Sequence, residues 1–593
     1  MRFSLRKVES VRGLVVAAIA VALLLLLGFT PWPMQRPAIE RQFASLFAAG
    51  GGTELAVAGS ASFTLLPLPH INVRQVTMNY RGGTVLARAD QATIGVDGWA
   101  LLSGRVAPRN VLFSGLAMQA AGEPGAAPLD TLRRLFQSAH LSQALPDIGW
   151  IAVRAGQLRL GASPQGKDTL EQFDAVWRPG EAARSFSLTL DGRWRGEAVK
   201  LAMTAPSDLA PAQASSIASS LEIDTRLLSL SFQGQVLGGG EPKAVGRLKA
   251  SSPDGLALSR WLGIAPPLPG QLDQFGIGGD LAANWQQLSL SNAQISLNGD
   301  RYDGVVGLRF DGKRPNISAT LNTESADLTS QFQFLAPRRD ADGAWSNERY
   351  NVKALNAAHV DLRLSARRLV LSRLALDNAA ISLLLDERRF EVSLAEAALA
   401  GGVAKARLTI TPNARSVELR GQATVTGADI GAILSKNFDI HRLNGQISTT
   451  ISVESSGDST AALIDNLGGS TRISIANGKL IGIDLDRFML RLERRSLFSA
   501  LDVPAGETPF DEMVLDAAIN AGRLEIKACS FVSPTLKVSL SGRTEAPTRR
   551  LDFNGAIASN EQNGRAPAAL PFTIRGSWAA PKFSPQLSEF RRL

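Results

Sequence analysis

The chain has 593 residues, of which 45% are apolar and 20% are charged, and its net charge is +9. This composition is that of folded protein and excludes a chain that is disordered throughout. The length exceeds the size at which single hydrophobic cores stop growing, so we expect several domains or one elongated, repetitive body. A single cysteine, Cys529, excludes an internal disulfide and a cysteine-based zinc cluster.

The positive charge is scattered along the chain as single arginines and short pairs, such as Arg367-Arg368 and Arg494-Arg495. Side chains of this kind are mostly solvated surface residues of folded protein. A basic balance fits nucleic acid, anionic lipid or no charged partner at all. If the body lies outside the cytoplasm, nucleic acid is disfavoured as a partner, and acidic membrane headgroups are the alternative.

The first predicted element is an uncharged segment, Gly13 to Phe29, which reads GLVVAAIAVALLLLLGF. A helix needs about 20 mostly apolar residues to cross a bilayer, and residues 13–32 supply that length. Positive charge beside a span stays cytoplasmic, and four basic residues lie at or before its start: Arg2, Arg6, Lys7 and Arg12. We therefore predict a cytoplasmic N-terminus (1–12), a transmembrane anchor (13–32) and a body on the far side of the membrane. In a two-membrane bacterium this means a single-pass inner-membrane protein with a periplasmic body.

A cleaved signal peptide is the alternative interpretation of this segment. The residues that follow, GFTPWPMQRP, lack the small-x-small pattern at which such peptides are cut. Trp32 also stands where interfacial aromatic residues flank a membrane span. Both observations favour an anchor over a signal peptide.

Beyond the anchor, most of the sequence alternates apolar and polar residues with a period of two, interrupted by Gly, Pro, Asn and Asp. The pattern is clear in four segments: 184–194, 359–371, 406–412 and 416–425. Alternation of this kind predicts strands with one buried face. Because no strand–helix–strand rhythm is present, we expect a mainly β chain with an antiparallel sheet that is apolar on one side and polar on the other.

A few short helices are expected between the strands. Apolar residues at helical spacing predict helices at 38–49 and at 130–145, the second with Asp130 as its N-cap. Shorter helical segments are expected as caps or packing elements at 99–102, 255–262, 326–334, 428–438 and 485–495. Asp484 precedes the last of these and is expected to be its N-cap, because Asp is favoured at that position.

Several longer segments occur in a characteristic order. A helix and a glycine run follow the anchor, and SFTLLPLPHINVRQVTM and LARADQATIGVDGWALLSGR come next. Two later segments share a strand-Gly-Gly-strand pattern: RRFEVSLAEAALAGGVAKARLTITPNARSVELRGQATVTGADIGAIL and LNGQISTTISVESSGDSTAALIDNLGGSTRISIANGKLIGIDLDRFM. The chain closes on ALPFTIRGSWAAPKFSPQL. This order resembles the AsmA family of bacterial envelope proteins, and it divides the body into an N-terminal AsmA-like β region (33–129), a middle β-rich region (130–425) and a C-terminal AsmA-like region (426–593).

The resemblance implies a body similar to that of bridge-like lipid transfer proteins: an elongated, curved antiparallel β-sheet whose apolar concave face forms a groove for acyl chains. It also implies a part in outer-membrane assembly or in phospholipid or lipopolysaccharide homeostasis. Membrane phospholipids or other envelope lipids would be the partners, and envelope proteins at the distal C-terminal end are further candidates. The family has no established catalytic residues, so none is carried over.

The alternating apolar face supplies ten candidates for contact with lipid: Leu408, Ile410, Val417, Leu419, Ile451, Val453, Ile473, Ile475, Leu536 and Val538. In a closed β-sandwich the same face would be core, and periodicity does not separate a sandwich from an open groove. Aromatic residues are only 6% of the chain, and the largely aliphatic face and the anchor favour the groove.

No motif for catalysis, a cofactor or a metal is present. The four histidines, His70, His140, His359 and His441, lie far apart and lack metal-ligand spacing. Nucleophile-elbow, P-loop and dinucleotide motifs are also missing. We therefore expect no catalytic, cofactor-binding or metal-binding residues and a protein that is not an enzyme. The resemblance, together with the anchor and the one-faced β body, implies a protein that binds or conducts lipid. A non-catalytic periplasmic scaffold or regulatory protein for outer-membrane protein assembly is the alternative, and a wall-processing hydrolase with a carboxylate pair is a weaker one.

Overall fold

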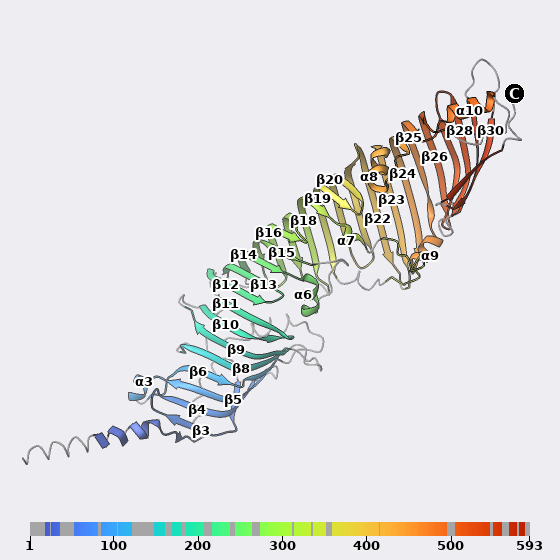
Figure 1. Ribbon diagram of the computed structural model, residues 1–593. Coiled ribbons are helices and arrows are strands. Elements are labelled where there is room, and N and C mark those ends of the chain that lie inside the picture. Colours follow the sequence, from blue (N-terminus) through green and yellow to red (C-terminus); the bar gives the residue numbers. More distant parts are fainter. Residues whose placement is uncertain are drawn as a thin grey trace, which may run out of the picture. The chain divides into compact units, whose positions relative to one another are not determined.

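The structure is a computed structural model (Figure 1). It describes residues 18–19, 21–23, 25–35, 53–80, 85–103, 105–120, 148–160, 169–180, 185–206, 216–237, 243–263, 273–310, 314–333, 336–350, 358–413, 415–494, 504–545, 550–559, 569–577 and 580–586. The chain divides into two compact units. Unit 1 comprises Met1–Pro253 and Gly276–Trp285, and unit 2 comprises Asp254–Phe275 and Gln286–Leu593.

The described part of unit 1 contains helical residues near its N-terminus, the short helix α3 (Gly98–Leu102) and a series of strands. Its strands are β1 (Trp32–Pro33), β2 (Thr53–Val57), β3 (Ala61–Thr64), β4 (His70–Tyr80), β5 (Val85–Val96), β6 (Pro108–Ser114), β7 (Ala117–Ala120), β8 (Trp150–Leu160), β9 (Thr169–Pro179), β10 (Ser185–Trp194), β11 (Glu197–Pro206), β12 (Ser216–Thr225), β13 (Ser229–Leu237), β14 (Lys243–Ser252) and most of β15 (Phe275–Ala283). From β8 to β14 each strand pairs antiparallel with the next.

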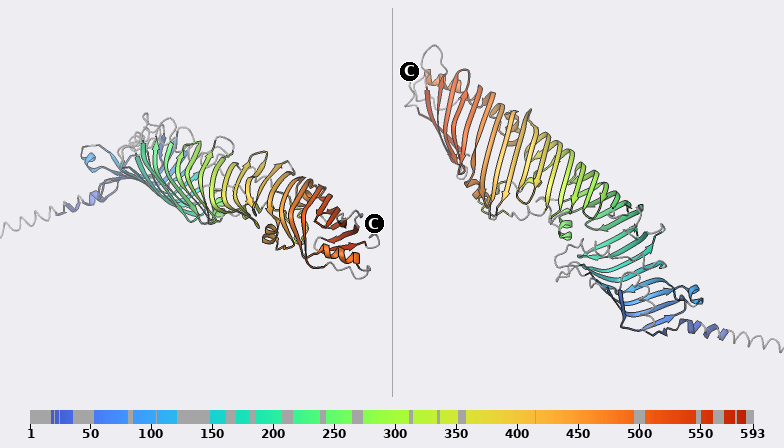
Figure 2. Two further views of the ribbon diagram at one scale, coloured as in Figure 1. Left: turned by 90° about the horizontal axis from the view of Figure 1, so that it is seen from above. Right: turned by 180° about the vertical axis from the view of Figure 1, so that it is seen from behind.

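Unit 2 is a series of strands that follow one another in chain order (Figures 1 and 2). They are β16 (Gln287–Leu297), β17 (Asp300–Arg309), β18 (Asn316–Asp327), β19 (His359–Leu371), β20 (Leu374–Leu385), β21 (Phe390–Leu399), β22 (Gly402–Pro412), β23 (Val417–Asp429), β24 (Leu443–Gly457), β25 (Gly468–Ile481), β26 (Glu507–Asn520), β27 (Arg523–Val532), β28 (Leu536–Glu545), β29 (Arg550–Ser559), β30 (Ala569–Ser577) and β31 (Ala580–Pro585). The prediction of a mainly β chain with few short helices is confirmed.

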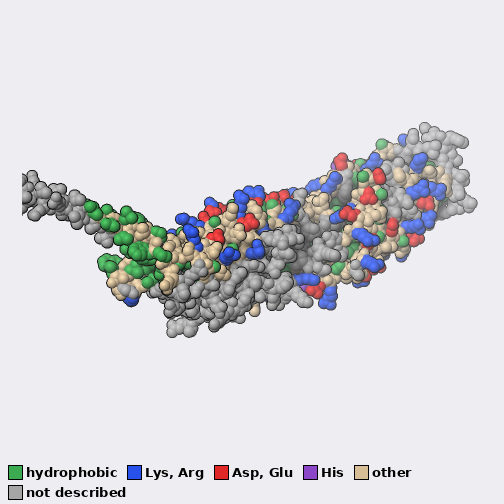
Figure 3. All heavy atoms as spheres, turned by 90° about the horizontal axis from the view of Figure 1, so that it is seen from below, with side chains coloured by type: hydrophobic (Ala, Val, Ile, Leu, Met, Phe, Trp, Pro, Cys, Tyr) green, Lys and Arg blue, Asp and Glu red, His purple; other side chains and the backbone are tan. Residues whose placement is uncertain are grey.

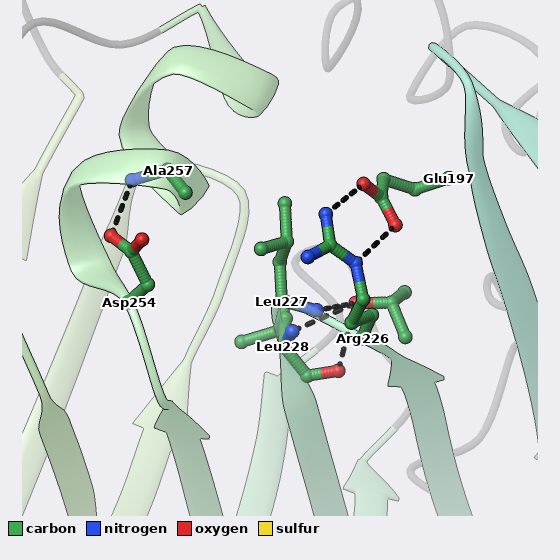
Figure 4. A network of polar contacts seen from close by, with 7 residues as sticks. Glu197, Arg226, Leu227, Leu228, Asp254 and Ala257 are labelled. Atoms are coloured by element: carbon green, nitrogen blue, oxygen red, sulfur yellow. Dashed lines mark hydrogen bonds and ion pairs between the residues drawn. The ribbon is translucent and has the colours of Figure 1, made fainter.

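The helices of unit 2 are α6 (Gly255–Leu262), α7 (Thr329–Phe332), α8 (Ile430–Phe438), α9 (Thr460–Asp465) and α10 (Leu485–Arg494). Side-chain caps explain where three of them begin, because the Asp254, Asp429 and Ser459 side chains accept hydrogen bonds from backbone N–H groups of the first turn (Figure 4 shows Asp254). Asp484 caps α10 as predicted, since its Oδ1 accepts from the Arg487 N–H at 2.8 Å.

One predicted helix is largely wrong. The expected helix at 326–334 is confined to Thr329–Phe332, and Ala326 and Asp327 belong to β18. These two residues pair with Leu369 and Val370 of β19, and Ala326 is completely buried. The sheet ladder and the burial of a small side chain outweigh the local helical spacing there. The predicted helices at 38–49 and 130–145 lie outside the described residues.

The ladders are antiparallel with a few exceptions that the sequence did not predict. β18 and β19 are parallel, and so are β6 with β8 and β7 with β8. Parallel neighbours require a long crossover connection that returns the chain to the edge of the sheet where the first strand began. The connection from β18 to β19 contributes residues to the cavity of unit 2.

The N-terminal segment contains helical residues at 18–19, 21–23 and 25–29. Among the residues that the structure describes, no helix has both the length and the apolar character required to cross a bilayer. The predicted span 13–32 includes residues 13–17, 20 and 24, which lie outside the described set.

An exposed ion pair fastens β11 to the turn after β12 in unit 1. Arg226 donates from Nη2 to Glu197 Oε1 at 2.6 Å and from Nε to Oε2 at 3.2 Å (Figure 4). The Arg226 hydrogen bonds lower the pKa of Glu197. A lowered folded-state pKa stabilises the fold above the unfolded-state pKa, and that contribution is lost as the pH falls through the folded-state pKa.

We therefore expect Glu197→Gln to lower the thermal unfolding temperature slightly at neutral pH, because exposed pairs contribute little. The difference from the unsubstituted protein should shrink as the pH falls through the folded-state pKa of Glu197, and it should also shrink in high salt. Circular dichroism melts of both proteins over a pH series provide the measurement. A difference that grows in acid would contradict the assignment.

Candidate functional site

Apolar side chains form cross-strand rows on one face of the unit 2 sheet. One row runs from β18 to β23: Ile317, Val360, Leu385, Phe390, Ile410 and Leu419. The next runs from β18 to β24: Ala319, Leu362, Leu383, Val392, Leu408, Gly421 and Val453. Directly paired residues project to the same side of a sheet, so the register turns the alternation of each strand into a continuous apolar face.

The opposite face of these strands is polar. Arg407 is paired with Ser393 and Gln422, and its Nε donates to Ser393 Oγ at 3.3 Å. Farther along, Arg472 of β25 binds Asp516 of β26 with both ends of its guanidinium group, at 2.6 and 3.0 Å. The sheet of unit 2 therefore has one apolar and one charged, solvated side, as the alternation predicts.

The ten predicted residues all share the apolar face by register. Leu408 and Ile410 lie on β22, Val417 and Leu419 on β23, Ile451 and Val453 on β24, Ile473 and Ile475 on β25, and Leu536 and Val538 on β28. The link from β25 to β28 runs through the pairs Ile475–Met513, Met513–Phe531 and Phe531–Val538. Their surroundings nevertheless differ along the sheet.

Some of the ten are covered by the protein's own side chains. Ile475 is buried in a cluster with Ile430 of α8 and Phe510. Leu536 is buried against Phe488 of α10. Val417 is also buried, whereas Leu419, Ile473 and Val538 are half-buried. Here the apolar face is core, with α8 and α10 acting as the packing elements that the sequence predicted.

The crossover between β18 and β19 extends over the same apolar face. We call its residues 328–333 and 336–350 the strap. It starts at the end of β18, where the Leu328 N–H donates to the Val370 carbonyl at 3.0 Å. It reaches the opposite edge of the sheet beside α9, where the Tyr350 hydroxyl lies 2.9 Å from Thr460 Oγ1. Between these ends, Phe332 of α7 packs on a core cluster that contains Phe390 and Leu385.

A cavity of about 880 Å³ lies between the strap and the sheet. Thr329 and Phe332 line it from the strap. Apolar side chains of the sheet also line it: Leu371, Ile381, Val392, Leu394, Ala406, Leu408, Ala423, Ile451 and Val453. This volume is in the range of small-molecule sites, about 300–1,000 Å³. Three of the ten predicted residues, Leu408, Ile451 and Val453, therefore line one cavity, and Ile410 instead packs against the Phe390 cluster.

Polar residues also line the cavity: Asp327, Thr329, Ser330 and Gln333 at its α7 end, Ser372 after β19, and Arg407 and Gln422 on the sheet. Asp327 lines the cavity, and Thr329 donates to its Oδ1 from the backbone at 2.9 Å. Hydrogen bonds from Thr329 lower the pKa of Asp327, so its carboxylate is ionised at neutral pH. An anionic ligand group is disfavoured beside Asp327, and the aliphatic part of the lining is suited to an alkyl chain.

The sequence did not predict that residues of the strap, or residues of strands β20 and β21, line the cavity. Ile381, Val392 and Leu394 do alternate with polar or exposed neighbours, which is a usable signal. Phe332 carried no such signal, because its role depends on a crossover between parallel strands.

Unit 1 also carries an apolar row, which runs across nine successive pairings: Ile71, Ile94, Val111, Ile151, Trp177, Leu188, Met203, Leu221, Phe232 and Leu248. A smaller cavity in this unit, of about 410 Å³, has a mixed lining that includes Asp191 and Lys200 beside Leu190 and Leu201. Its charged lining makes it a poorer site for an alkyl chain than the cavity of unit 2.

Within the described ranges, no group of three or more His, Cys, Asp or Glu side chains is arranged to hold a metal ion. Cys529 lies on β27, and burial raises the pKa of its thiol.

The part of the chain that contains the cavity is similar to a known protein family. The sequence model of the AsmA family matches residues 280–529, a stretch that includes the strap and strands β16 to β26. No curated protein and no solved structure matches the chain. Residues 280–529 of the chain are therefore similar to the AsmA family.

Proposed function

We propose that the protein binds the acyl chains of membrane phospholipids, or of other envelope lipids, on the apolar face of its sheet. In this proposal it is a non-enzymatic bacterial envelope protein that supports outer-membrane assembly or lipid homeostasis. The observation that carries the proposal is the cavity of about 880 Å³ between the strap and the sheet, lined by aliphatic side chains of several neighbouring strands. The match to the AsmA family, a family of envelope proteins, supports it.

The energetics of transfer support an acyl chain as the ligand. Each methylene removed from water contributes about 0.8 kcal/mol, so a chain in an apolar cavity loses little of the stabilisation that it had in a bilayer. A headgroup remains outside in this arrangement, because burying a charge without a partner is costly. The ionised Asp327 directs an anionic headgroup away from the α7 side of the cavity.

The proposed location is the periplasm, with residues 13–32 as a single inner-membrane anchor and residues 1–12 in the cytoplasm. The uncharged run from Gly13 to Phe29 and the preceding basic residues support this orientation. Lipid drawn from the inner membrane would then be the natural ligand. Envelope proteins at the C-terminal end remain proposed partners.

A second candidate, a scaffold for protein assembly, is favoured by the covered part of the apolar face. Ile475 and Leu536 are buried by the protein's own α8 and α10 side chains and offer no lipid site in this arrangement. A scaffold would use the exterior of the sheet and leave the cavity without lipid.

Photocrosslinking of the full chain in bacterial membranes separates these functions. Leu408 is replaced by p-benzoylphenylalanine. Thr409, its neighbour on the opposite face, pairs with Glu391 and Arg420, does not line the cavity and serves as the matched control position. Lipid binding predicts a phospholipid adduct at position 408 and none at 409. Protein adducts at both positions, without lipid, would overturn the proposal in favour of the scaffold.

A further inference from the structure

Exposed apolar side chains gather at one edge of unit 1, around the end of the N-terminal helix (Figure 3). Trp99 and Leu102 of α3 are 84% and 80% exposed, and Leu68 of the neighbouring loop is 73% exposed. We call the following set the apolar rim: Phe29, Trp32, Leu65, Leu68, Trp99 and Leu102. Single exposed apolar residues are ordinary, but a contiguous group of large ones marks an interaction surface.

Hydrogen bonds and close packing join the parts of the apolar rim. The backbone N–H groups of Leu65 and Leu66 donate to the Gly28 carbonyl at 3.2 and 2.8 Å. A Cβ atom at Gly28 would collide with the Leu66 side chain, so glycine permits this close approach. The Trp32 Nε1 donates to the Leu27 carbonyl at 3.1 Å. The end of the helix, β1 and the loop after β3 therefore form one local structure.

The short helix α3 is fixed beside this loop. Asp97 Oδ1 accepts hydrogen bonds from the Trp99 and Ala100 N–H groups at 2.8 and 3.2 Å. The Val96 N–H donates to the Pro69 carbonyl at 2.8 Å, which connects the end of β5 to the loop. Trp99 and Leu102 are thus held outward by backbone structure, and their exposure is built into the fold at the edge where β3 and β5 end and β4 begins.

We propose that the apolar rim docks on the interface of a lipid bilayer, beside the membrane-embedded N-terminal helix. Three observations select a bilayer over a protein partner. The rim is continuous with a helix whose Leu25, Leu26 and Leu27 are all exposed. It contains Trp32 and Trp99, and tryptophan is enriched at the headgroup level of membranes. Arg105 follows α3 and is exposed, where a guanidinium group can reach anionic headgroups while its stem covers apolar surface.

Docking of the apolar rim has a consequence for unit 1. It would turn the edge formed by the loop after β3 and by α3 toward the bilayer, so that the first strands of the apolar row stand next to the membrane. Ile71 on β4 and Ile94 on β5 begin this row, only a few residues from the rim. This inference rests on the membrane attachment in the proposed function, but it is independent of the cavity in unit 2.

Fluorescence quenching by lipid tests the docking. The full chain with Cys529→Ser receives Leu102→Cys, is labelled with an environment-sensitive dye and is reconstituted into vesicles of phosphatidylethanolamine and phosphatidylglycerol. A lipid with a nitroxide near its ester linkage is then added. We expect a blue shift of the dye emission and a loss of fluorescence at position 102. Ser229→Cys, an exposed position on β13, is the matched control and should show neither effect.

A third labelling position, Leu26→Cys on the N-terminal helix, makes the outcomes distinguishable. Quenching at position 26 without quenching at 102 would overturn the docking of the apolar rim and leave the anchor intact. Quenching at neither position would overturn both. Trp99→Glu in the Leu102→Cys chain should abolish quenching at 102, whereas Trp99→Phe should retain it. None of these results depends on lipid in the cavity of unit 2, which the crosslink at position 408 tests separately.

Discussion

Leu408→Arg is expected to abolish phospholipid binding by the cavity while the sheet remains folded. Leu408 is half-buried and lies between Val392 and Gly421 in a cross-strand apolar row. Its side chain lines the cavity. A guanidinium group there stands among alkyl side chains, and an acyl chain would have to desolvate it. Because 1.4 kcal/mol corresponds to tenfold in affinity and burying a charge costs more than that, we expect a loss of more than about tenfold.

The measurement is the amount of phospholipid that copurifies with the protein, determined by mass spectrometry of lipid extracts. Thr409→Ala is the matched control, since Thr409 is the adjacent residue on the polar face, where it pairs with Glu391 and Arg420, and does not line the cavity. Ile451→Arg tests a second cavity position in case the first variant misfolds, and circular dichroism reports folding. Equal lipid loss from Leu408→Arg and Thr409→Ala, with both proteins folded, would exclude the apolar face as the binding surface.

Phe390→Ala is expected to lower the stability of unit 2 strongly. Phe390 is completely buried, and it lies in the core cluster with Val360, Leu383 and Leu385 on which Phe332 of the strap packs. Truncating a buried phenylalanine removes its transfer free energy and leaves a void, which together cost about 3–5 kcal/mol. The loss should also loosen the strap, because Phe332 packs on the cluster that contains Phe390.

Urea unfolding monitored by circular dichroism gives the change in free energy of unfolding. Leu374→Ala is the control, because Leu374 is on the neighbouring strand β20 but is exposed, and surface substitutions usually stay within about 0.5 kcal/mol. Limited proteolysis should cut the Phe390→Ala variant faster within the strap. A loss of stability no larger than that of Leu374→Ala would show that the strap and the sheet do not share this core.

Much of the local structure could be predicted from the sequence. Successive side chains of a strand point to opposite faces, so alternation in 359–371 and 406–412 predicted β19 and β22 and assigned their apolar sides. Capping is equally local, and Asp484 before Leu485 correctly predicted the start of α10. The shortened helix α7 is the exception, because pairing of Ala326 with Leu369 depends on a strand that lies far along the chain.

The sequence by itself determined a chain of two-faced strands with short capped helices, because periodicity and capping act over a few residues. The tertiary structure alone decided which apolar residues are covered. Leu408 and Ile475 have the same alternating pattern, yet Leu408 lines a cavity and Ile475 is buried under α8. That difference arises from the parallel pairing of β18 with β19, which sends the strap across the sheet, and from the packing of helices onto distant strands. Contacts between segments so far apart in the chain leave no trace in the local spacing of residues.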